Sequence, residues 1–228
     1  MLRELRDDTG NWFRSWQESG QPQARHRALA ADLANLIDAF TRLGEATGKS
    51  SWITRAREVA DQLLENYWDE TNFGLFTIAN DAEQLIVRQK DLIDNATPSA
   101  NSTAALALMR LAALTGDAKY ETAALNILRL FTRITASAPS AFGNLLSAVH
   151  LQSAGITEIV ITGSRTDLLG HVQKRWLPTA VVAWGEQYDS PIWADRPQGF
   201  AFVCQNYTCA APADTIDELN AAFRSALN

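Results

Sequence analysis

The chain has 228 residues, of which 46% are hydrophobic, and a formal net charge of −6. This length and apolar fraction suit one large or two small folded domains and exclude an intrinsically disordered chain. The acidic balance, with no basic cluster interleaved with aromatic residues, argues against nucleic acid as the partner. No apolar run has membrane-spanning length and the charged N-terminus has no apolar signal core, so we expect no membrane partner and a cytoplasmic location.

The first predicted helix follows a polar lead-in formed by residues 1–22. Its apolar residues recur at spacings of three and four over residues 29–43, which gives one buried stripe. Gly48 is suited to end this helix in a left-handed conformation, and Ser50 or Ser51 to cap a second helix behind it. These signals together predict a helical hairpin.

A second hairpin is predicted after a polar connection at residues 81–98, which itself follows a turn and a short strand at 74–78. The helix over residues 99–114 is apolar on nearly all sides, with Arg110 as its only charge. Such a helix is buried on more than one face, which favours an inner helix of a two-layer ring. Gly116 is predicted to end it.

The partner helix of this second hairpin is predicted to begin after Asp117, which can cap it. Its apolar face extends to about residue 134. A third helix, over about residues 140–153, begins after Pro139 and would open a third hairpin.

A repeated motif supports this hairpin architecture. The pattern Arg-Leu-x-x-x-Thr-Gly-x-x-x-[Trp/Tyr]-x-Thr-x-Ala runs from Arg42 to Ala56 and again from Arg110 to Ala124, an offset of 110 − 42 = 68 residues. Each copy lies where one amphipathic helix is followed by the next. Repeated helical hairpins are typical of a solenoid or a closed helical toroid.

The repeat ends near residue 154, and the remaining chain predicts a small α/β segment. Strands at 158–162 and 179–184 flank a helix at 166–176, which indicates a parallel β-α-β unit. A further strand at 200–203 precedes a helix at 215–227 with a capping box. The predicted fold is mainly α, with about two and a half helical hairpins of a partial (α/α)6 toroid in residues 1–154 and the α/β segment in residues 155–228.

Cys204 and Cys209 are separated by four residues. Structural zinc needs four ligands, and no second Cys or His pair is near in the sequence. Because the cytosol keeps thiols reduced, we expect two structural thiols rather than a disulfide or a metal site. The sequence therefore predicts neither a metal nor a cofactor.

Polar residues gather where the inner helices of the predicted ring begin. Helix N-termini offer free amides and a partial positive charge, and the 68-residue offset aligns Asp94 with His26 and Ala100 with Asp32. This rim is predicted to bind a sugar or another polyhydroxylated small molecule. Two carboxylates are what glycoside hydrolysis or sugar epimerisation requires, so Asp94 and Asp32 are the catalytic candidates.

The substrate-binding candidates at this rim are Asn95, Ser99, Asn101, His26 and Arg88. For these residues, a structural role is the alternative to a role in ligand binding. Ser99 and Asn101 are also suited to cap the helix, and His26 to lie on the solvated surface. Arg88 and Lys90 can instead form ion pairs with Asp91 or Asp94.

Several segments resemble one known family. The segment Asp94-Asn95-Ala96-Thr97-Pro98-Ser99-Ala100-Asn101-Ser102 resembles its Asp-x-Ala-x-Pro-Ser-x-Asn-Ser signature, with Ala100 in place of the usual Gly. Further matches lie at residues 12–16, 31–34, 67–70, 74–76 and 202–212. The family is that of thioredoxin-domain-containing proteins related to the bacterial YyaL type and the spermatogenesis-associated animal homologue.

This resemblance implies a six-hairpin glycosidase-like barrel, similar to N-acylglucosamine 2-epimerases, and a link to carbohydrate metabolism. It also implies a thioredoxin-like domain with a Cys-x-x-Cys motif, which this sequence lacks, so no redox activity is expected. A closed ring needs twelve helices, so we expect this chain to be the C-terminal part of a longer protein, with self-association or docking of a missing N-terminal portion. The alternative is a non-catalytic scaffold or protein-interaction module, and whether the chain is an enzyme stays open.

Overall fold

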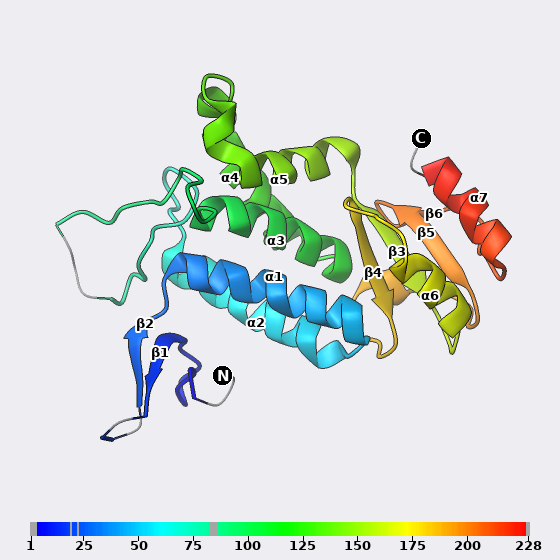
Figure 1. The fold of residues 1–228 in the computed structure, drawn as a ribbon, viewed down its shortest axis with the longest axis horizontal. Coiled ribbons are helices and arrows are strands. Elements are labelled where there is room, and N and C mark those ends of the chain that lie inside the picture. The colour runs from blue at the N-terminus through cyan, green and yellow to red at the C-terminus, as the bar shows by residue number, and fades with distance from the viewer. Residues whose placement is uncertain (1–3, 19, 22, 83–85, 227–228) are drawn as a thin grey trace.

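The computed structural model describes residues 4–18, 20–21, 23–82 and 86–226. Leu227, which we expected in the last helix, lies outside these residues. Two helical hairpins and the first helix of a third form the larger helical part of the described chain, and a small α/β segment follows them (Figure 1). The predicted fold class is therefore confirmed. None of the described helices is both long and apolar enough to cross a membrane.

The helices form two layers. Inner helices α1 (Ala30–Thr47), α3 (Ala100–Thr115) and α5 (Gly143–Ala154) pack side by side in that order, with α5 entered through a 3-10 turn at Pro139–Phe142. Outer helices α2 (Ser50–Tyr67) and α4 (Ala118–Thr135) pack behind α1 and α3. The central helix α3 is buried on nearly every side, as its apolar sequence predicted.

The repeated Thr-Gly motif forms the same turn in both hairpins. Thr47 and Thr115 each donate a hydroxyl hydrogen bond to the carbonyl four residues earlier, at 2.6 and 2.7 Å. Gly48 and Gly116 then adopt left-handed φ values of 66° and 71°, which end α1 and α3. A side chain at either glycine would collide with the C-terminal segment, at Trp184 or Pro191 respectively.

The C-terminal segment is a mixed sheet in the order β4-β3-β5-β6. Strands β3 (Thr157–Ile161) and β4 (Ala180–Trp184) are parallel and joined by α6 (Thr166–Gln173), whereas β5 (Ala201–Gln205) and β6 (Thr208–Cys209) run antiparallel. One face of the sheet, including Val160, Val181 and Phe202, joins the hydrophobic core of the inner helices. The other face packs against α6 and the last helix, α7 (Ile216–Ala226).

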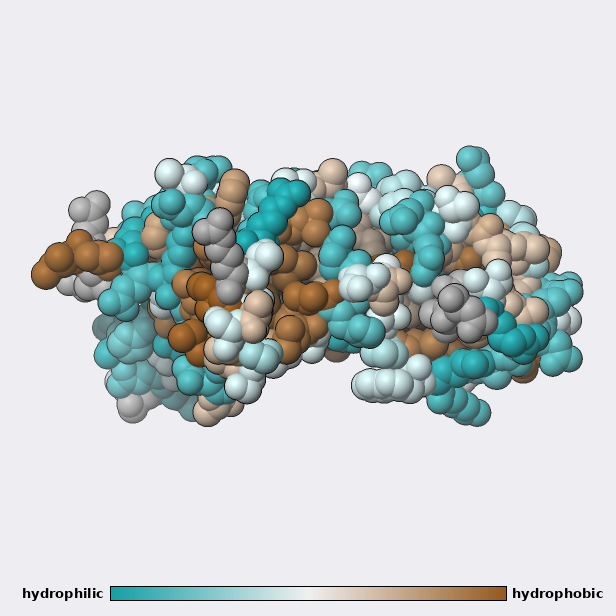
Figure 2. All heavy atoms as spheres, turned by 90° about the horizontal axis from the view of Figure 1, so that it is seen from above, coloured by the Kyte–Doolittle hydropathy of each residue, from teal (hydrophilic) through white to brown (hydrophobic). Residues whose placement is uncertain are grey.

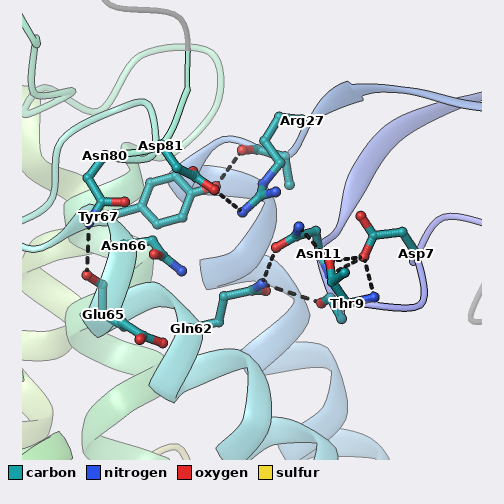
Figure 3. Close-up of polar contacts among 12 residues, drawn as sticks. Asp7, Thr9, Asn11, Arg27, Gln62, Glu65, Asn66, Tyr67, Asn80 and Asp81 are labelled. Atoms are coloured by element: carbon teal, nitrogen blue, oxygen red, sulfur yellow. Dashed lines mark hydrogen bonds and ion pairs between the residues drawn. The ribbon is translucent and has the colours of Figure 1, made fainter.

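The N-terminal segment, expected as a polar lead-in over residues 1–22, is followed by and contains strands that the sequence did not predict. Strands β1 (Phe13–Gln17) and β2 (Gln23–Arg27) form an antiparallel hairpin. Polar contacts join this region to α2 and to the connection that follows it, as Figure 3 shows: Gln62 Nε2 of α2 donates to Asn11 Oδ1 at 3.2 Å, and Arg27 pairs with Asp81 of the connection at 3.3 Å. The aromatic residues of β1, Phe13 and Trp16, lie on opposite faces of the strand, and β2 has Ala24 as its single apolar residue, so neither strand shows the apolar alternation that would have predicted it.

Two further local predictions were wrong. Neither Ser50 nor Ser51 caps α2; instead the carboxylate of Glu186 accepts hydrogen bonds from the Ser50 backbone N–H and hydroxyl, both at 3.0 Å. The segment at 74–78 is not a strand and forms only an isolated bridge between Trp68 and Leu75. In both cases a contact from elsewhere in the chain replaced the local interaction.

The expectation of two free thiols was also wrong, because Cys204 and Cys209 are joined in a disulfide. They are cross-strand partners in the pairing of β5 with β6. The guanidinium of Arg196 lies beside both sulfur atoms. The short β6 strand, absent from the sequence prediction, is what brings the two residues together.

A buried ion pair joins the inner helices to the sheet. Arg110 of α3 donates to both carboxylate oxygens of Glu45 of α1, at 2.9 and 2.8 Å, and its side chain is 3% exposed. Strand β4 completes the arrangement, since Val182 N–H donates to Glu45 and Arg110 donates to the Ala180 carbonyl, both at 2.9 Å. Helices α1 and α3 and strand β4, which are distant in the sequence, are therefore joined through the Glu45–Arg110 pair.

We expect Arg110→Met to lower the free energy of unfolding by about 3–5 kcal/mol, because it leaves a buried carboxylate without its charged partner. Urea denaturation at neutral pH measures this loss. The control is Asp38→Asn, which breaks the exposed pair of Asp38 with Arg42 and should cost less than about 0.5 kcal/mol. Similar losses in the two variants would contradict a linking role for the Glu45–Arg110 pair.

Candidate functional site

The predicted catalytic residue Asp94 lies between the beginnings of two inner helices. Its Oδ1 accepts a hydrogen bond from Ser99 N–H at 2.8 Å, where α3 begins. Its Oδ2 accepts from the N–H groups of Asn144 and Leu145, at 2.8 and 3.2 Å, in the first turn of α5. One carboxylate therefore satisfies free amides at two helix N-termini, where negative charge is also favoured by the helix dipoles.

The surroundings of Asp94 keep it ionised. Burial alone raises the pKa of its carboxyl, but hydrogen bonds from the Ser102 side chain and from three backbone N–H groups outweigh that effect. The pKa consequently lies below the ordinary value of 3.8. A carboxyl with a lowered pKa is ionised at neutral pH, which suits an anchor and opposes a role as general acid.

Ser99 and Asn101 also serve the start of α3. The hydroxyl of Ser99 accepts a hydrogen bond from Ser102 N–H at 3.1 Å. The Asn101 amide is fully buried, accepts from Leu75 N–H at 2.7 Å, and donates to the carbonyls of Leu75 and Asp91. Two of the family-like segments, at 74–76 and 94–102, thus meet in one structural contact.

The second catalytic candidate, Asp32, caps α1. Its Oδ2 accepts from Leu29 N–H at 2.8 Å and also pairs with Arg14 Nε at 2.8 Å. Among the described residues, Asp32 and Asp94 share no hydrogen-bond or ion-pair partner. The contacts therefore give the two carboxylates separate structural roles, and their joint action as acid and base stays a prediction.

Of the remaining rim candidates, Arg88 makes structural contacts, whereas His26 and Asn95 are exposed to solvent. Arg88 donates to the carbonyls of Asn66 and Ile78 and stacks 4.1 Å from the Phe76 ring centroid. The predicted ion pairs of Arg88 and Lys90 with Asp91 or Asp94 were wrong. Arg88 donates to backbone carbonyls instead, and Lys90 pairs with Asp69 at 2.8 Å.

His26 and Asn95 are the two rim candidates that are exposed. His26 lies in β2 with a positive φ of 60°, and Asn95 lies in the connection before α3, where its backbone N–H donates to the Thr97 carbonyl at 3.1 Å. Their side chains are the ones at this rim with room for a ligand.

A larger open site lies on the inner helices themselves. A cavity of about 920 Å³ is lined by α1, α3 and α5 on the side away from the outer helices, and by the end of α6 and β4. We call it the inner-face cavity. The charged, imidazole and indole side chains in its lining are Arg42, Glu45, Arg110, His150, Arg175 and Trp176.

The inner-face cavity combines a fixed polar floor with an open apolar wall. The Glu45–Arg110 pair forms the floor, and Arg110 Nε has no hydrogen-bond partner within the described part of the chain. Trp176 is 88% exposed and Leu146 is 39% exposed. Ligand sites of this kind hold a ring on apolar groups and orient it with a few polar ones.

One feature of the sequence indicates this cavity. Arg110 is the only charge in an otherwise apolar helix, and a buried charge requires a partner. Nothing local indicated that the partner is Glu45 or that the turn carrying Trp176 reaches α5. Within the described residues, no group of three or more His, Cys, Asp or Glu side chains could hold a metal ion.

Two layers of helical hairpins with an open inner face define part of an α/α toroid of the six-hairpin glycosidase-like class. The family profile described as glycosyl hydrolase family 47 matches residues 32–191. The chain belongs to this family. The match covers all five helices of the two layers and continues into the sheet.

Animal relatives agree with the family resemblance seen in the sequence. Human spermatogenesis-associated protein 20 is 28% identical over 200 residues, covering 79% of this chain and 25% of the human protein. The rat protein of the same name is 33% identical over 58% of this chain and 17% of its own length. An uncharacterized protein of Caenorhabditis elegans is 25% identical over 95% of this chain and 32% of its own length. The chain thus spans about a third or less of these relatives.

One solved structure is also similar, that of cellobiose 2-epimerase from Spirochaeta thermophila. It aligns with a TM-score of 0.44 and 18% sequence identity, covering 57% of this chain and 34% of the epimerase.

Replacing Asp94 tests its role as a double cap. We expect Asp94→Asn to cost about 1.5–3 kcal/mol of stability at neutral pH, because a charged acceptor of several buried N–H groups is lost. Since the folded-state pKa is lowered, the wild-type advantage is full above the ordinary value of 3.8 and is lost as the pH falls below it. Thermal melts from neutral to acid pH follow the difference.

The matched control is Asp81→Asn, which removes one carboxylate whose side chain is 55% exposed. It should change stability by less than about 1 kcal/mol. A difference between Asp94→Asn and wild type that stays constant down to strongly acid pH would contradict the assignment.

Proposed function

We propose that this chain contributes a carbohydrate-binding surface to a glycosidase-like toroid, with the ligand held in the inner-face cavity. The observation that carries the proposal is the cavity itself, about 920 Å³ in volume on the inner side of α1, α3 and α5. Membership of a family described as glycosyl hydrolases supports a sugar as the ligand. The cavity is more open to a ligand than the polar rim at Asp94.

The lining suits a sugar ring. Trp176 offers an exposed aromatic face on which the C–H face of a ring can pack. His150 and the floor pair Glu45–Arg110 supply donors and acceptors for hydroxyl groups. An apolar wall with a few convergent polar groups is the usual composition of a small-molecule site.

Hydrolysis would need more than this chain supplies at the cavity. Glycoside hydrolysis generally uses two carboxyl groups on either side of the scissile bond. Among the described residues lining the cavity, Glu45 is the single carboxylate, and it is already engaged by Arg110 and the Val182 N–H. We therefore assign binding to this chain and leave catalysis by Asp94 and Asp32 as a prediction for the whole protein.

Titration of the chain with neutral mono- and oligosaccharides tests the proposal. We expect chemical-shift changes at His150 and Trp176 and weak binding, with a Kd of about 1 mM. Trp176→Ala should weaken binding about tenfold or more, whereas Trp16→Ala, which removes another exposed tryptophan, should leave it unchanged. Binding that is insensitive to Trp176→Ala but lost in Asp94→Asn would move the site to the rim.

A second candidate function is that of a protein-interaction module. Figure 2 shows hydrophobic residues gathered on the face over α4 and α5, where a groove of about 340 Å³ runs between the two helices. Val149 of α5 is 40% exposed at this groove. The third hairpin has no outer helix within the described residues, because α5 leads directly into β3.

Self-association through this groove is the outcome expected from the second candidate. Sedimentation analysis should show a dimer that forms as the concentration rises, and Val149→Glu should shift it toward monomer. Ile93→Glu is the control, since Ile93 is 50% exposed but does not line the groove. A monomer at all concentrations, or equal effects of the two variants, would contradict this function.

A further inference from the structure

We infer that the inner-face cavity takes an anionic saccharide, that is, a sugar ring carrying a carboxylate or phosphate group. This inference rests on the proposed function and narrows it, because it names the class of sugar for the same cavity. Three features carry it: the charge balance of the lining, the availability of two arginines, and the apolar wall beside them.

The charge balance of the cavity is opposite to that of the chain. Three arginines line it, at positions 42, 110 and 175, against one carboxylate, Glu45, whereas the whole chain carries a net charge of −6. The Glu45 carboxylate is 2.8 Å from Arg110 Nη2, so these two charges balance each other. The uncompensated positive charge of the lining therefore belongs to Arg42 and Arg175.

Neither of these arginines is paired with a buried carboxylate in the described part of the chain. Arg42 is 52% exposed and its ion pair, with Asp38 at 3.3 Å, is a single contact between exposed side chains four residues apart. Such pairs are worth only a few tenths of a kcal/mol and exchange readily. Arg175 forms hydrogen bonds with His171 and Asn220, its guanidinium lies 4.8 Å from the Phe223 ring centroid, and it has no carboxylate partner among the described residues.

The guanidinium group selects the kind of anion. Its planar fork matches a carboxylate or a phosphate with two parallel hydrogen bonds. Neither group alone would use the apolar wall formed by Trp176, Leu177 and Pro178. An anionic group attached to a ring uses both the wall and the arginines, so the lining favours an anionic sugar over a neutral sugar or a free inorganic anion.

Calorimetric titration of this chain at low ionic strength tests the inference with four probes: glucose, glucuronate, glucose 6-phosphate and inorganic phosphate. We expect at least one of the two anionic sugars to bind about tenfold or more tightly than glucose, a difference that added salt reduces. Glucuronate and glucose 6-phosphate distinguish a carboxylate from a phosphate. Inorganic phosphate shows whether the ring is needed.

Arg42→Gln should weaken binding of the preferred anionic sugar about fivefold or more, and should weaken glucose binding less than that. The matched control is Arg129→Gln, an exposed arginine on α4 that is hydrogen-bonded to Asn126, 2.9 Å away. Both variants lose one surface charge, so a specific role for Arg42 appears as a difference between them.

The possible results separate the inference from the proposed function. Equal affinity for glucose and the anionic sugars, or equal effects of Arg42→Gln and Arg129→Gln, overturns the anionic preference and leaves sugar binding intact. Inorganic phosphate binding as tightly as glucose 6-phosphate overturns the role of the ring. Failure of all the sugars to bind overturns the proposed function and the inference together.

Discussion

The buried pair of Glu45 and Arg110 is the interaction on which the arrangement of this chain depends. Removing two charges from water costs several kcal/mol per ion, and only close contact and further hydrogen bonds offset that cost. Here the offset comes from three places at once: α1 supplies the carboxylate, α3 the guanidinium, and β4 an N–H and a carbonyl. The pair is satisfied only when the two hairpins and the sheet are all in place, and it then becomes the floor of the inner-face cavity.

The two ends of the inner helices make different contacts with the rest of the chain. At the C-terminal end, Gly48 and Gly116 approach the sheet segment so closely that neither could carry a side chain there. Glu186, from that segment, reaches back to cap α2. At the N-terminal end, Asp94 occupies the free amides of α3 and α5. The sheet segment and Asp94 therefore engage the two ends of the inner helices, and the inner-face cavity lies between those ends.

Sequence periodicity predicted most of the helices and strands but not the site. The apolar stripes and glycine stops placed all five helices of the two layers, and the two apolar runs placed the parallel strands. The β1–β2 hairpin was missed because its apolar residues do not alternate along either strand, and the cap of α2 was missed because Glu186 is 136 residues away from Ser50. The rim was visible because its residues are consecutive. The inner-face cavity was not visible in the sequence, because its lining comes from three helices and the turn at Trp176, which only the tertiary fold brings together.

The carboxylates of this chain that were considered for catalysis are all engaged in structural contacts. A pair of carboxyl groups on one ligand is the usual requirement for glycoside hydrolysis, yet Asp94 and Asp32 are engaged with helix amides, and Glu45 is held by Arg110. The relatives are three or more times as long as the portion this chain matches, so further groups can face the same cavity in a complete toroid. Sugar binding would then be a property of this chain. Turnover would depend on how the rest of such a toroid places a second carboxylate opposite the inner-face cavity.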